Sequence, residues 1–140
     1  MNITSKQARA MGIDVPARNK YGAKKTVYNG VKYDSLAEAD RAAELDAMLV
    51  AGEIAWWLRQ IQIPLGSPNV TLRVDFVIGY RVSGVPKGLL QVYAEEVKGF
   101  EGERFRVLKK LWPKFGLFPL HILKRNGRGW DREVVSIDGM

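Results

Sequence analysis

Cysteine is absent from the 140-residue sequence, and this absence narrows the chemistry available to the chain. Without thiols there is no disulfide framework and no thiolate metal site, which suits a reducing compartment. The sequence also lacks the run of about 18 apolar residues that would predict a transmembrane helix. It begins without the apolar core of a signal peptide. We therefore expect a soluble cytoplasmic protein.

Two further scarcities limit the enzyme classes. The single histidine, His121, lies in the apolar stretch "LFPLHIL", where we interpret it as a structural residue. Catalysis by a serine–histidine or cysteine–histidine pair is therefore poorly supported. No glycine-rich segment has the spacing of a P-loop, so nucleotide hydrolysis is not predicted either.

Charge is distributed unevenly along the chain, whose formal net charge is +7. Residues 1–33 and 100–130 are strongly basic, whereas residues 34–99 carry nine carboxylates against six basic side chains. Basic flanks around an acidic centre are typical of a protein that binds a polyanion and also holds a cation. A generic basic protein with solvated lysines is the alternative interpretation of the same pattern.

The hydrophobic pattern predicts an α+β fold with a central mixed β-sheet flanked by helices. We expect a β-hairpin, a helix, three strands, a second helix and two short strands, in that order: 24–35, 35–50, 54–65, 71–82, 89–100, about 103–113, 117–123 and 132–137. The hairpin is predicted from Asn29-Gly30, a type I′ turn dipeptide, and the first helix from the capping box between Ser35 and Glu38. Residues 1–19 precede this domain and are expected to form a flexible basic arm.

Helical spacing and strand alternation assign faces to two of these elements. In the first helix, Glu38 lies on the stripe that we expect to pack inward, together with Ala42, Leu45 and Leu49; most of the other helix charges lie off this stripe. In the strand at 71–82, one face is expected to carry every alternate apolar residue: Leu72, Val74, Phe76, Ile78 and Tyr80.

Charged residues interrupt the two strands predicted at 71–82 and 89–100. If the loop between them is symmetric, Asp75 faces Glu96 and Arg73 faces Lys98. Two facing carboxylates repel each other, and a divalent cation between them would turn the repulsion into attraction. Alternation turns Glu95 to the opposite face, where we expect it to act as a cap or to form a salt bridge.

Each of these acids also has an ordinary structural explanation. Charges on edge strands discourage aggregation, and Glu38 belongs to the capping box. Together, however, Glu38, Asp75, Glu96 and Lys98 would form a single constellation of three acids and a lysine. Three separate structural explanations would be needed to replace it.

These residues resemble the PD-(D/E)XK nuclease superfamily, which has a helix with an acid, a strand with an aspartate, a strand with E-x-K and then a basic helix. The motif stands here as Glu38, then Val74-Asp75, then Glu96-Val97-Lys98, with Val74 in place of the proline. The segment "KYGAKKTVYNGVKYDSLAEADRAAEL" is also similar to the opening of a family of small phage-encoded proteins grouped with Holliday-junction resolvases. The likeness spans roughly residues 20–125.

The resemblance implies a restriction-endonuclease-like core, with residues 20–140 as the nuclease domain. It implies a Mg²⁺-dependent endodeoxyribonuclease, usually a homodimer, which hydrolyses phosphodiesters in branched DNA and leaves 5′-phosphates. For a phage-encoded protein the compartment would be the host cytoplasm. A Holliday junction resolvase is the function expected first. An endonuclease for flaps, nicks or specific duplex sequences is the alternative within the superfamily, and a non-catalytic nucleic-acid-binding module is the alternative from another class.

Roles for individual residues also follow from the resemblance. Asp75 and Glu96 would bind Mg²⁺ or Mn²⁺ together with the main-chain carbonyl of Val97. Glu38 would support this metal or a second one, directly or through water. Lys98 would orient or deprotonate the attacking water and offset charge on the phosphate.

The remaining predictions concern DNA contacts and aromatic residues. Phosphate contacts are expected from basic residues that directly follow the arm and from those of the last helix: Lys20, Lys24, Lys25, Arg104, Arg106, Lys109 and Lys110. A solvated basic face is the alternative. Gln60 and Gln62 precede the aspartate strand, where related nucleases often carry a glutamine near the site. Trp56, Trp57 and Trp112 are interpreted as core or dimer-interface residues.

Overall fold

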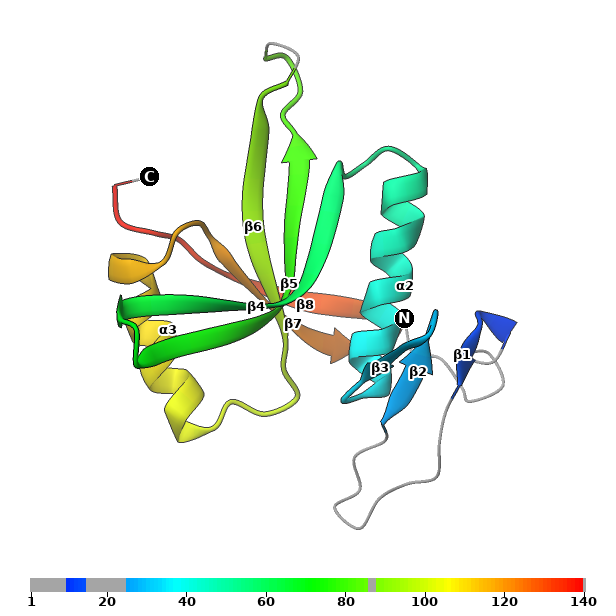
Figure 1. The fold of residues 1–140 in the computed structure, drawn as a ribbon, viewed down its shortest axis with the longest axis horizontal. Coiled ribbons are helices and arrows are strands. Elements are labelled where there is room, and N and C mark those ends of the chain that lie inside the picture. Colours follow the sequence, from blue (N-terminus) through cyan, green and yellow to red (C-terminus); the bar gives the residue numbers. More distant parts are fainter. Residues whose placement is uncertain (1–9, 15–24, 86–87, 140) are drawn as a thin grey trace.

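A five-stranded β-sheet forms the centre of the structure, a computed structural model that describes residues 10–14, 25–85 and 88–139 (Figure 1). Its strands lie in the order β4-β5-β6-β7-β8. Their bounds are β4 (Trp56–Ser67), β5 (Val70–Arg81), β6 (Leu90–Val97), β7 (Leu120–Asn126) and β8 (Gly129–Val135). Strands β6 and β7 are parallel and the other neighbours are antiparallel, so the sheet is mixed, as predicted.

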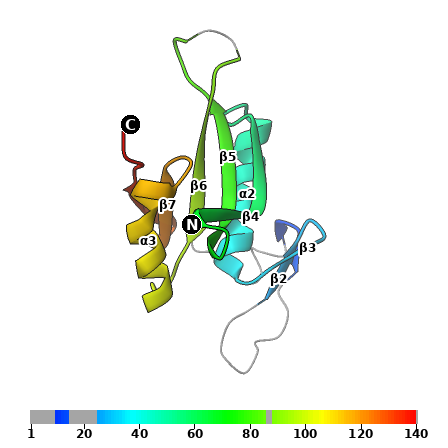
Figure 2. The ribbon, with the colours of Figure 1, turned by 60° about the vertical axis from the view of Figure 1, so that its left-hand side comes forward.

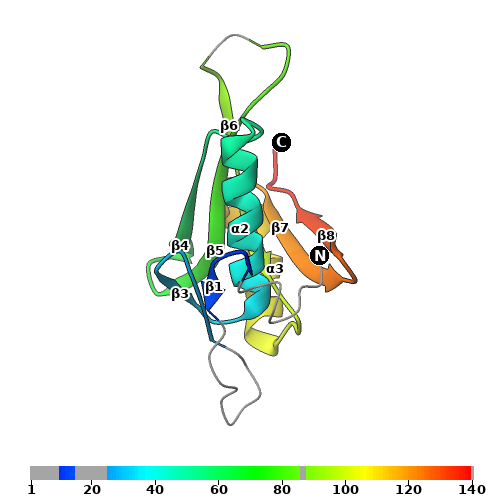
Figure 3. The same cartoon turned by 90° about the vertical axis from the view of Figure 1, so that its right-hand side faces the viewer.

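Two helices cover this sheet from opposite sides, α2 (Leu36–Val50) and α3 (Glu103–Phe115) (Figures 2 and 3). Helix α3 buries Phe105, Leu108 and Trp112 in the core on its side, and α2 buries Ala42 and Leu45 in the core on the other. Burying one large apolar side chain stabilises a fold by about 1.5–3 kcal/mol. The two apolar clusters therefore fix both helices to the sheet. Within the described residues, no helix is long and apolar enough to cross a membrane.

A second, three-stranded antiparallel sheet lies beside the first turns of α2 (Figure 1). It consists of β1 (Ile13–Asp14), β2 (Thr26–Tyr28) and β3 (Val31–Tyr33). The predicted hairpin is confirmed, because Asn29 and Gly30 both have the positive φ of a type I′ turn, 51° and 77°. Two residues of the predicted arm thus pair with β2, whereas residues 1–9 and 15–19 lie outside the described part of the chain.

Helix α2 begins as predicted. Ser35 is its N-cap, and the Ser35 hydroxyl accepts a hydrogen bond of 3.1 Å from the N–H of Glu38. The predicted apolar stripe is wrong at its last turn, where Leu49 is 40% exposed. Met48 packs against the core there instead. The capping signal is local and is therefore predictable, whereas the packing of the last turn depends on its neighbours.

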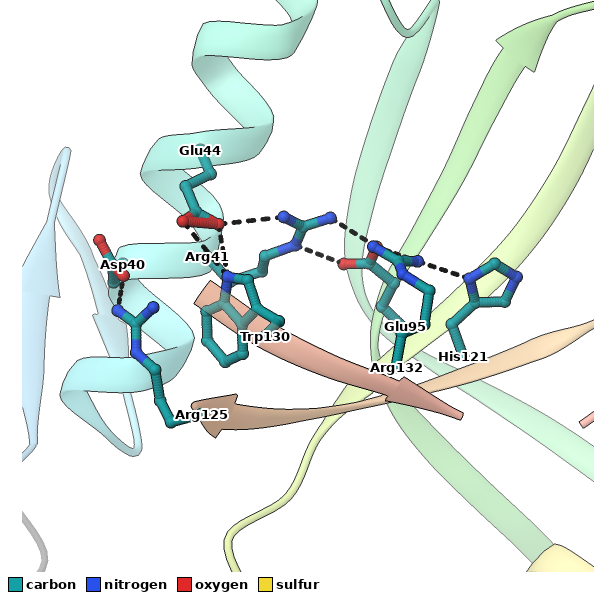
Figure 4. Close-up of polar contacts among 8 residues, drawn as sticks. All are labelled: Asp40, Arg41, Glu44, Glu95, His121, Arg125, Trp130 and Arg132. Carbon is teal, nitrogen blue, oxygen red and sulfur yellow. Dashed lines mark hydrogen bonds and ion pairs between the residues drawn. The ribbon is translucent and has the colours of Figure 1, made fainter. Parts of the chain in front are cut away.

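Two charges of α2 that lie off the apolar stripe are nevertheless buried, Asp40 and Arg41. The β7–β8 hairpin covers this side of the helix and brings Arg125 to Asp40 and Trp130 to Glu44 (Figure 4). Sequence periodicity indicates only one buried face of α2. The structure has two, and the second is held by charged and polar contacts.

Strand β5 changes face halfway along its length. Leu72 and Val74 belong to the core under α3, whereas Phe76 and Ile78 belong to the core under α2. Residues two apart in a regular strand share a face, so the alternation breaks at Asp75. The prediction of one continuous apolar face is therefore wrong, because the β4–β5 hairpin turns sharply here and serves both cores (Figure 1).

Strand β4 has a matching irregularity at Gln60, whose φ of 52° lies in the left-handed region. The ladder pairs on either side are Arg59 with Phe76 and Ile61 with Val74, so Gln60 stands opposite Asp75 without forming a ladder pair. For a non-glycine residue this conformation costs roughly 1–2 kcal/mol. The flanking pairs hold it in place.

Candidate active site

Asp75 and Glu96 meet where the ladder between β5 and β6 ends. The pairs of that ladder follow the predicted register. One step beyond the last pair, the Asp75 N–H donates to Glu96 Oε1 at 3.2 Å, and the Val97 N–H donates to Asp75 Oδ2 at 2.7 Å. Side chains therefore replace backbone pairing at this point and bring the two carboxyl groups together. The geometry agrees with the facing pair that the sequence predicts.

Burial makes this pair electrostatically costly. It raises the pKa of Asp75, and the neighbouring charge of Glu96 raises that pKa further. Burial also raises the pKa of Glu96, which is only 4% exposed, while hydrogen bonding to Asp75 and the charge of Lys98 oppose the rise. Two carboxylates this close and this poorly hydrated do not both ionise unless a positive charge compensates them.

Lys98 supplies part of that positive charge. Its Nζ lies 3.9 Å from Glu96 Oε2 and 4.6 Å from the centre of the Phe105 ring at the start of α3. The predicted pairing of Lys98 with Arg73 does not form. The β5–β6 ladder has already ended, and the Lys98 N–H donates instead to the Leu123 carbonyl of β7 at 2.9 Å. Lys98 is thus placed by β7 and α3 next to the acid pair.

Glu38 lies in the first turn of α2, close enough to Asp75 for their charges to interact. Burial raises the pKa of Glu38 to about 7, and the charges of Asp75 and Asp34 add to the rise. A hydrogen bond with the backbone of Asp34 and the charge of Arg59 act in the opposite direction. The Ser35 cap thus places Glu38 in the first turn of α2, where its charge reaches Asp75.

The donors fit a hard divalent cation. Over residues 10–14, 25–85 and 88–139, no three acidic or histidine side chains are close enough to form a metal-binding group by themselves. Glu38 therefore reaches the Asp75–Glu96 pair through its charge rather than as a third member of a closed cluster. Two carboxylates are the usual protein contribution to Mg²⁺, with water and phosphate oxygens completing the octahedron. Asp75 and Glu96 would hold such an ion, and Val97 is tied to the pair through its N–H.

Of the two glutamines considered from the sequence, the structure brings only Gln60 to the level of the acid pair. The Gln62 side chain donates to the Thr71 hydroxyl at 2.9 Å on an exposed part of the sheet. Gln60 stands across from Asp75 in its left-handed conformation. Its neighbour Arg59 is a residue that sequence reasoning missed.

Arg59 lies between the small sheet and the site. Its guanidinium stacks 4.6 Å above the Tyr33 ring and donates to the Lys32 carbonyl at 3.1 Å. Its charge lowers the pKa of Glu38. No sequence pattern marks Arg59, because its position depends on how the β2–β3 hairpin packs against β4.

Glu95 points away from the acid pair, as predicted. It is fully buried and forms an ion pair with Arg41 on α2, with Arg132 of β8 nearby at 3.4 Å (Figure 4). His121 is part of the same region: its Nδ1 lies 2.5 Å from Arg132 Nη1, and its ring stacks on Tyr93 at 4.3 Å. These contacts agree with the structural role expected for His121.

The basic residues of α3 differ from one another. Arg104, Arg106 and Lys110 are exposed. Lys109 Nζ is bound by two carboxylates, Glu101 at 2.9 Å and Glu133 at 2.8 Å, so much of its charge is compensated. Of the three basic residues that directly follow the arm, Lys25 is exposed, whereas Lys20 and Lys24 lie outside the described residues.

The tryptophans serve packing. Trp112 is fully buried, and its Nε1 donates to the Phe118 carbonyl at 2.7 Å. Trp57 Nε1 donates to Asp46 Oδ1 at 3.0 Å, and the Trp56 ring fills the space beside Gly79. These contacts fit the expected core role.

Comparisons with models of protein families, with curated proteins and with solved structures gave no match.

Proposed function

We propose that this protein is a metal-dependent endodeoxyribonuclease whose preferred substrate is branched DNA, with four-way junctions first among the branched forms. The observation that carries the proposal is the close pair of half-buried Asp75 and buried Glu96 at the broken end of the β5–β6 ladder. The proposal rests also on the resemblance to PD-(D/E)XK nucleases, whose residues at these positions hold Mg²⁺ or Mn²⁺. Carboxyl groups whose pKa values are raised by burial, beside a neighbouring charge, are candidates for a functional site.

The chemistry of phosphodiester hydrolysis matches these groups. A bound divalent cation would polarise the phosphoryl oxygens and make a water nucleophilic near neutral pH. Asp75 and Glu96 would supply carboxylate oxygens and the negative charge that retains a cation. Lys98, 3.9 Å from Glu96, can hold the attacking water or balance charge on the phosphate. Glu38, with a pKa raised to about 7, can hold or release a proton at neutral pH.

The substrate class rests on charge and on the resemblance. Arg106 and Lys110 are exposed on α3, whose first turn packs against Lys98 of the site. A DNA backbone that reaches the acid pair would therefore meet this basic helix. Symmetric cleavage of a four-way junction requires two active sites, and each chain supplies one. The proposal therefore includes a homodimer.

Substitution Asp75→Asn tests the proposal. Wild type is incubated with a synthetic four-way junction, a flap and a linear duplex, each with Mg²⁺ or with EDTA. We expect paired nicks in the junction only with Mg²⁺, and a loss of about 100-fold or more in Asp75→Asn, equivalent to about 3 kcal/mol of transition-state stabilisation. Binding to the junction should persist, because the substitution removes a negative charge.

Glu53→Gln is the control, since Glu53 is an exposed carboxylate outside the site. It should cleave like wild type. Preferential cleavage of flaps or duplex would show that the protein is an endonuclease but that four-way junctions are not its preferred substrate. Junction binding without cleavage under any metal condition would leave a nucleic-acid-binding module and refute the enzyme.

A further inference from the structure

One buried ion pair joins α2 to β6, two of the three elements that carry the site acids (Figure 4). Arg41 Nε and Nη2 each donate to one oxygen of Glu95 at 2.7 Å, so the contact is bidentate. Arg41 is 5% exposed and Glu95 is fully buried. A pair of this geometry fixes both the separation and the relative orientation of the two chain segments.

Two of the site acids lie close to this pair in the sequence. Glu95 directly precedes Glu96 on β6, and Arg41 follows Glu38 by about one turn of α2. The Arg41–Glu95 contact therefore spans from the helix that carries Glu38 to the strand that carries Glu96. Glu96 points to one face of β6, toward Asp75, and Glu95 points to the other, toward Arg41.

Surrounding groups hold the ion pair in position. Arg41 Nη1 also contacts Glu44 at 3.0 Å, and Glu44 accepts a hydrogen bond from Trp130 Nε1 at 2.8 Å. Arg132 approaches Glu95 from β8. Glu95 is thus restrained by Arg132 of β8, and Arg41 by Glu44 of its own helix, which β8 holds through Trp130. These contacts leave little freedom for the bidentate contact to shift.

Stability alone does not account for this arrangement. Apolar residues of similar size generally stabilise a fold as well as a buried ion pair does, because the pair must first lose its hydration. The particular property of the pair is defined geometry. Groups behind metal ligands that fix their orientation commonly change metal affinity 10–100-fold when they are removed.

We propose that Arg41 and Glu95 are positioning residues of the metal site, which set the place of Glu38 relative to the Asp75–Glu96 pair. This inference rests on the proposed function, because the ion pair matters for metal binding only if the site acids hold a cation.

The chain offers a matched control on the same helix. Asp40, next to Arg41, forms an ion pair with Arg125 of β7, and Asp40 is fully buried. The Arg125 guanidinium stacks 4.1 Å above the Trp130 ring. This pair ties α2 to the β7–β8 hairpin and makes no bond to β6 in the described structure. Its loss should weaken the fold without moving the strand of Glu96.

The test compares Arg41→Lys with Arg125→Lys in the full chain. Both substitutions keep the net charge and remove the arginine fork, so a difference between them reports geometry rather than electrostatics. The dissociation constant for Mn²⁺ is measured by calorimetry at a temperature where circular dichroism shows each variant to be folded. We expect Arg41→Lys to weaken Mn²⁺ binding about tenfold or more, and Arg125→Lys to stay within about twofold of wild type.

A second variant, Glu95→Gln, removes the other partner and should weaken Mn²⁺ binding in the same direction. If Arg41→Lys does not fold, the Mn²⁺ affinity of Glu95→Gln is compared with that of Arg125→Lys instead. Wild-type Mn²⁺ affinity in folded Arg41→Lys and Glu95→Gln would overturn the positioning role alone. Equal weakening in Arg125→Lys would overturn it too, by showing a general effect of loosening α2. Absence of Mn²⁺ binding by wild type would instead overturn the proposed function, and this inference with it.

Discussion

At the scale of single residues, the site is defined by acids whose environment disfavours their charge. Burial raises the pKa of Asp75, of Glu96 and of Glu38. Lys98 and Arg59 offset only part of this cost. A positive ligand would remove the rest, so the stability of the protein should depend on both protons and divalent cations.

Without divalent cations, the free energy of unfolding is expected to fall as pH rises from about 4.5 to about 7. Glu38 has its ordinary pKa of 4.5 when unfolded and a pKa of about 7 when folded. Between these values the native state keeps a proton that the unfolded state has released, so each step up in pH favours unfolding; above about 7 the contribution is constant. The raised pKa values of Asp75 and Glu96 act in the same direction.

Urea unfolding at a series of pH values measures this dependence. Glu38→Gln should flatten the fall over the same window, and millimolar Mg²⁺ at pH 8 should raise the stability of wild type more than that of Asp75→Asn. An unfolding free energy that increases over the window would contradict the assigned shifts.

At the scale of elements, the bend in β4 and β5 creates the site. The alternation of β5 breaks at Asp75, and Gln60 of β4 takes a left-handed conformation across from it. A regular hairpin would keep the backbone of Asp75 paired on both sides, in a continuous ladder. The break frees the Asp75 backbone N–H to donate to Glu96 instead.

Glycine at position 60 should therefore give a more stable protein than alanine does, the reverse of the usual order in a strand. We expect Gln60→Gly to exceed Gln60→Ala in unfolding free energy by about 1 kcal/mol, because only glycine takes a φ of 52° without cost.

The same pair of substitutions at Gln62, on the same strand, is the control for the position-60 comparison. There alanine should exceed glycine by about 0.5–1 kcal/mol. Chemical denaturation of the four variants gives both differences, and an equal order at the two positions would show that Gln60 is not strained.

At the scale of the whole molecule, positive charge is arranged around an acidic centre. Helix α3 begins beside Lys98 and carries exposed Arg106 and Lys110 outward from the site. Lys109 lies on the same helix but contacts Glu101 and Glu133. Basic residues that look equivalent in the sequence should therefore contribute unequally to DNA binding.

Lys110→Ala is expected to reduce the slope of log K against log salt for junction binding by about 1, because one phosphate contact is lost. Lys109→Ala should change the slope less, since its charge is already compensated. Binding is measured in the Asp75→Asn background, which prevents cleavage, at several salt concentrations. A larger change for Lys109→Ala would show that its ion pairs open when DNA binds.

Features that depend on local or periodic patterns could be predicted from the order of the amino acids. The type I′ turn at Asn29-Gly30 and the N-cap at Ser35 follow from near neighbours, and both are confirmed. The facing of Asp75 and Glu96, with Glu95 on the other side, follows from the two-residue period of a strand. The order of elements and the mixed sheet follow from the same patterns.

Features that depend on contacts between distant segments became visible only in the folded chain. The burial of Asp40 and Arg41 requires the β7–β8 hairpin to cover α2. The change of face at Asp75 requires two cores, one on each side of the sheet. Lys109 loses its free charge because β8 brings Glu133 beside it. Periodicity records which side of an element is apolar, but it does not record which other element will cover the remaining sides.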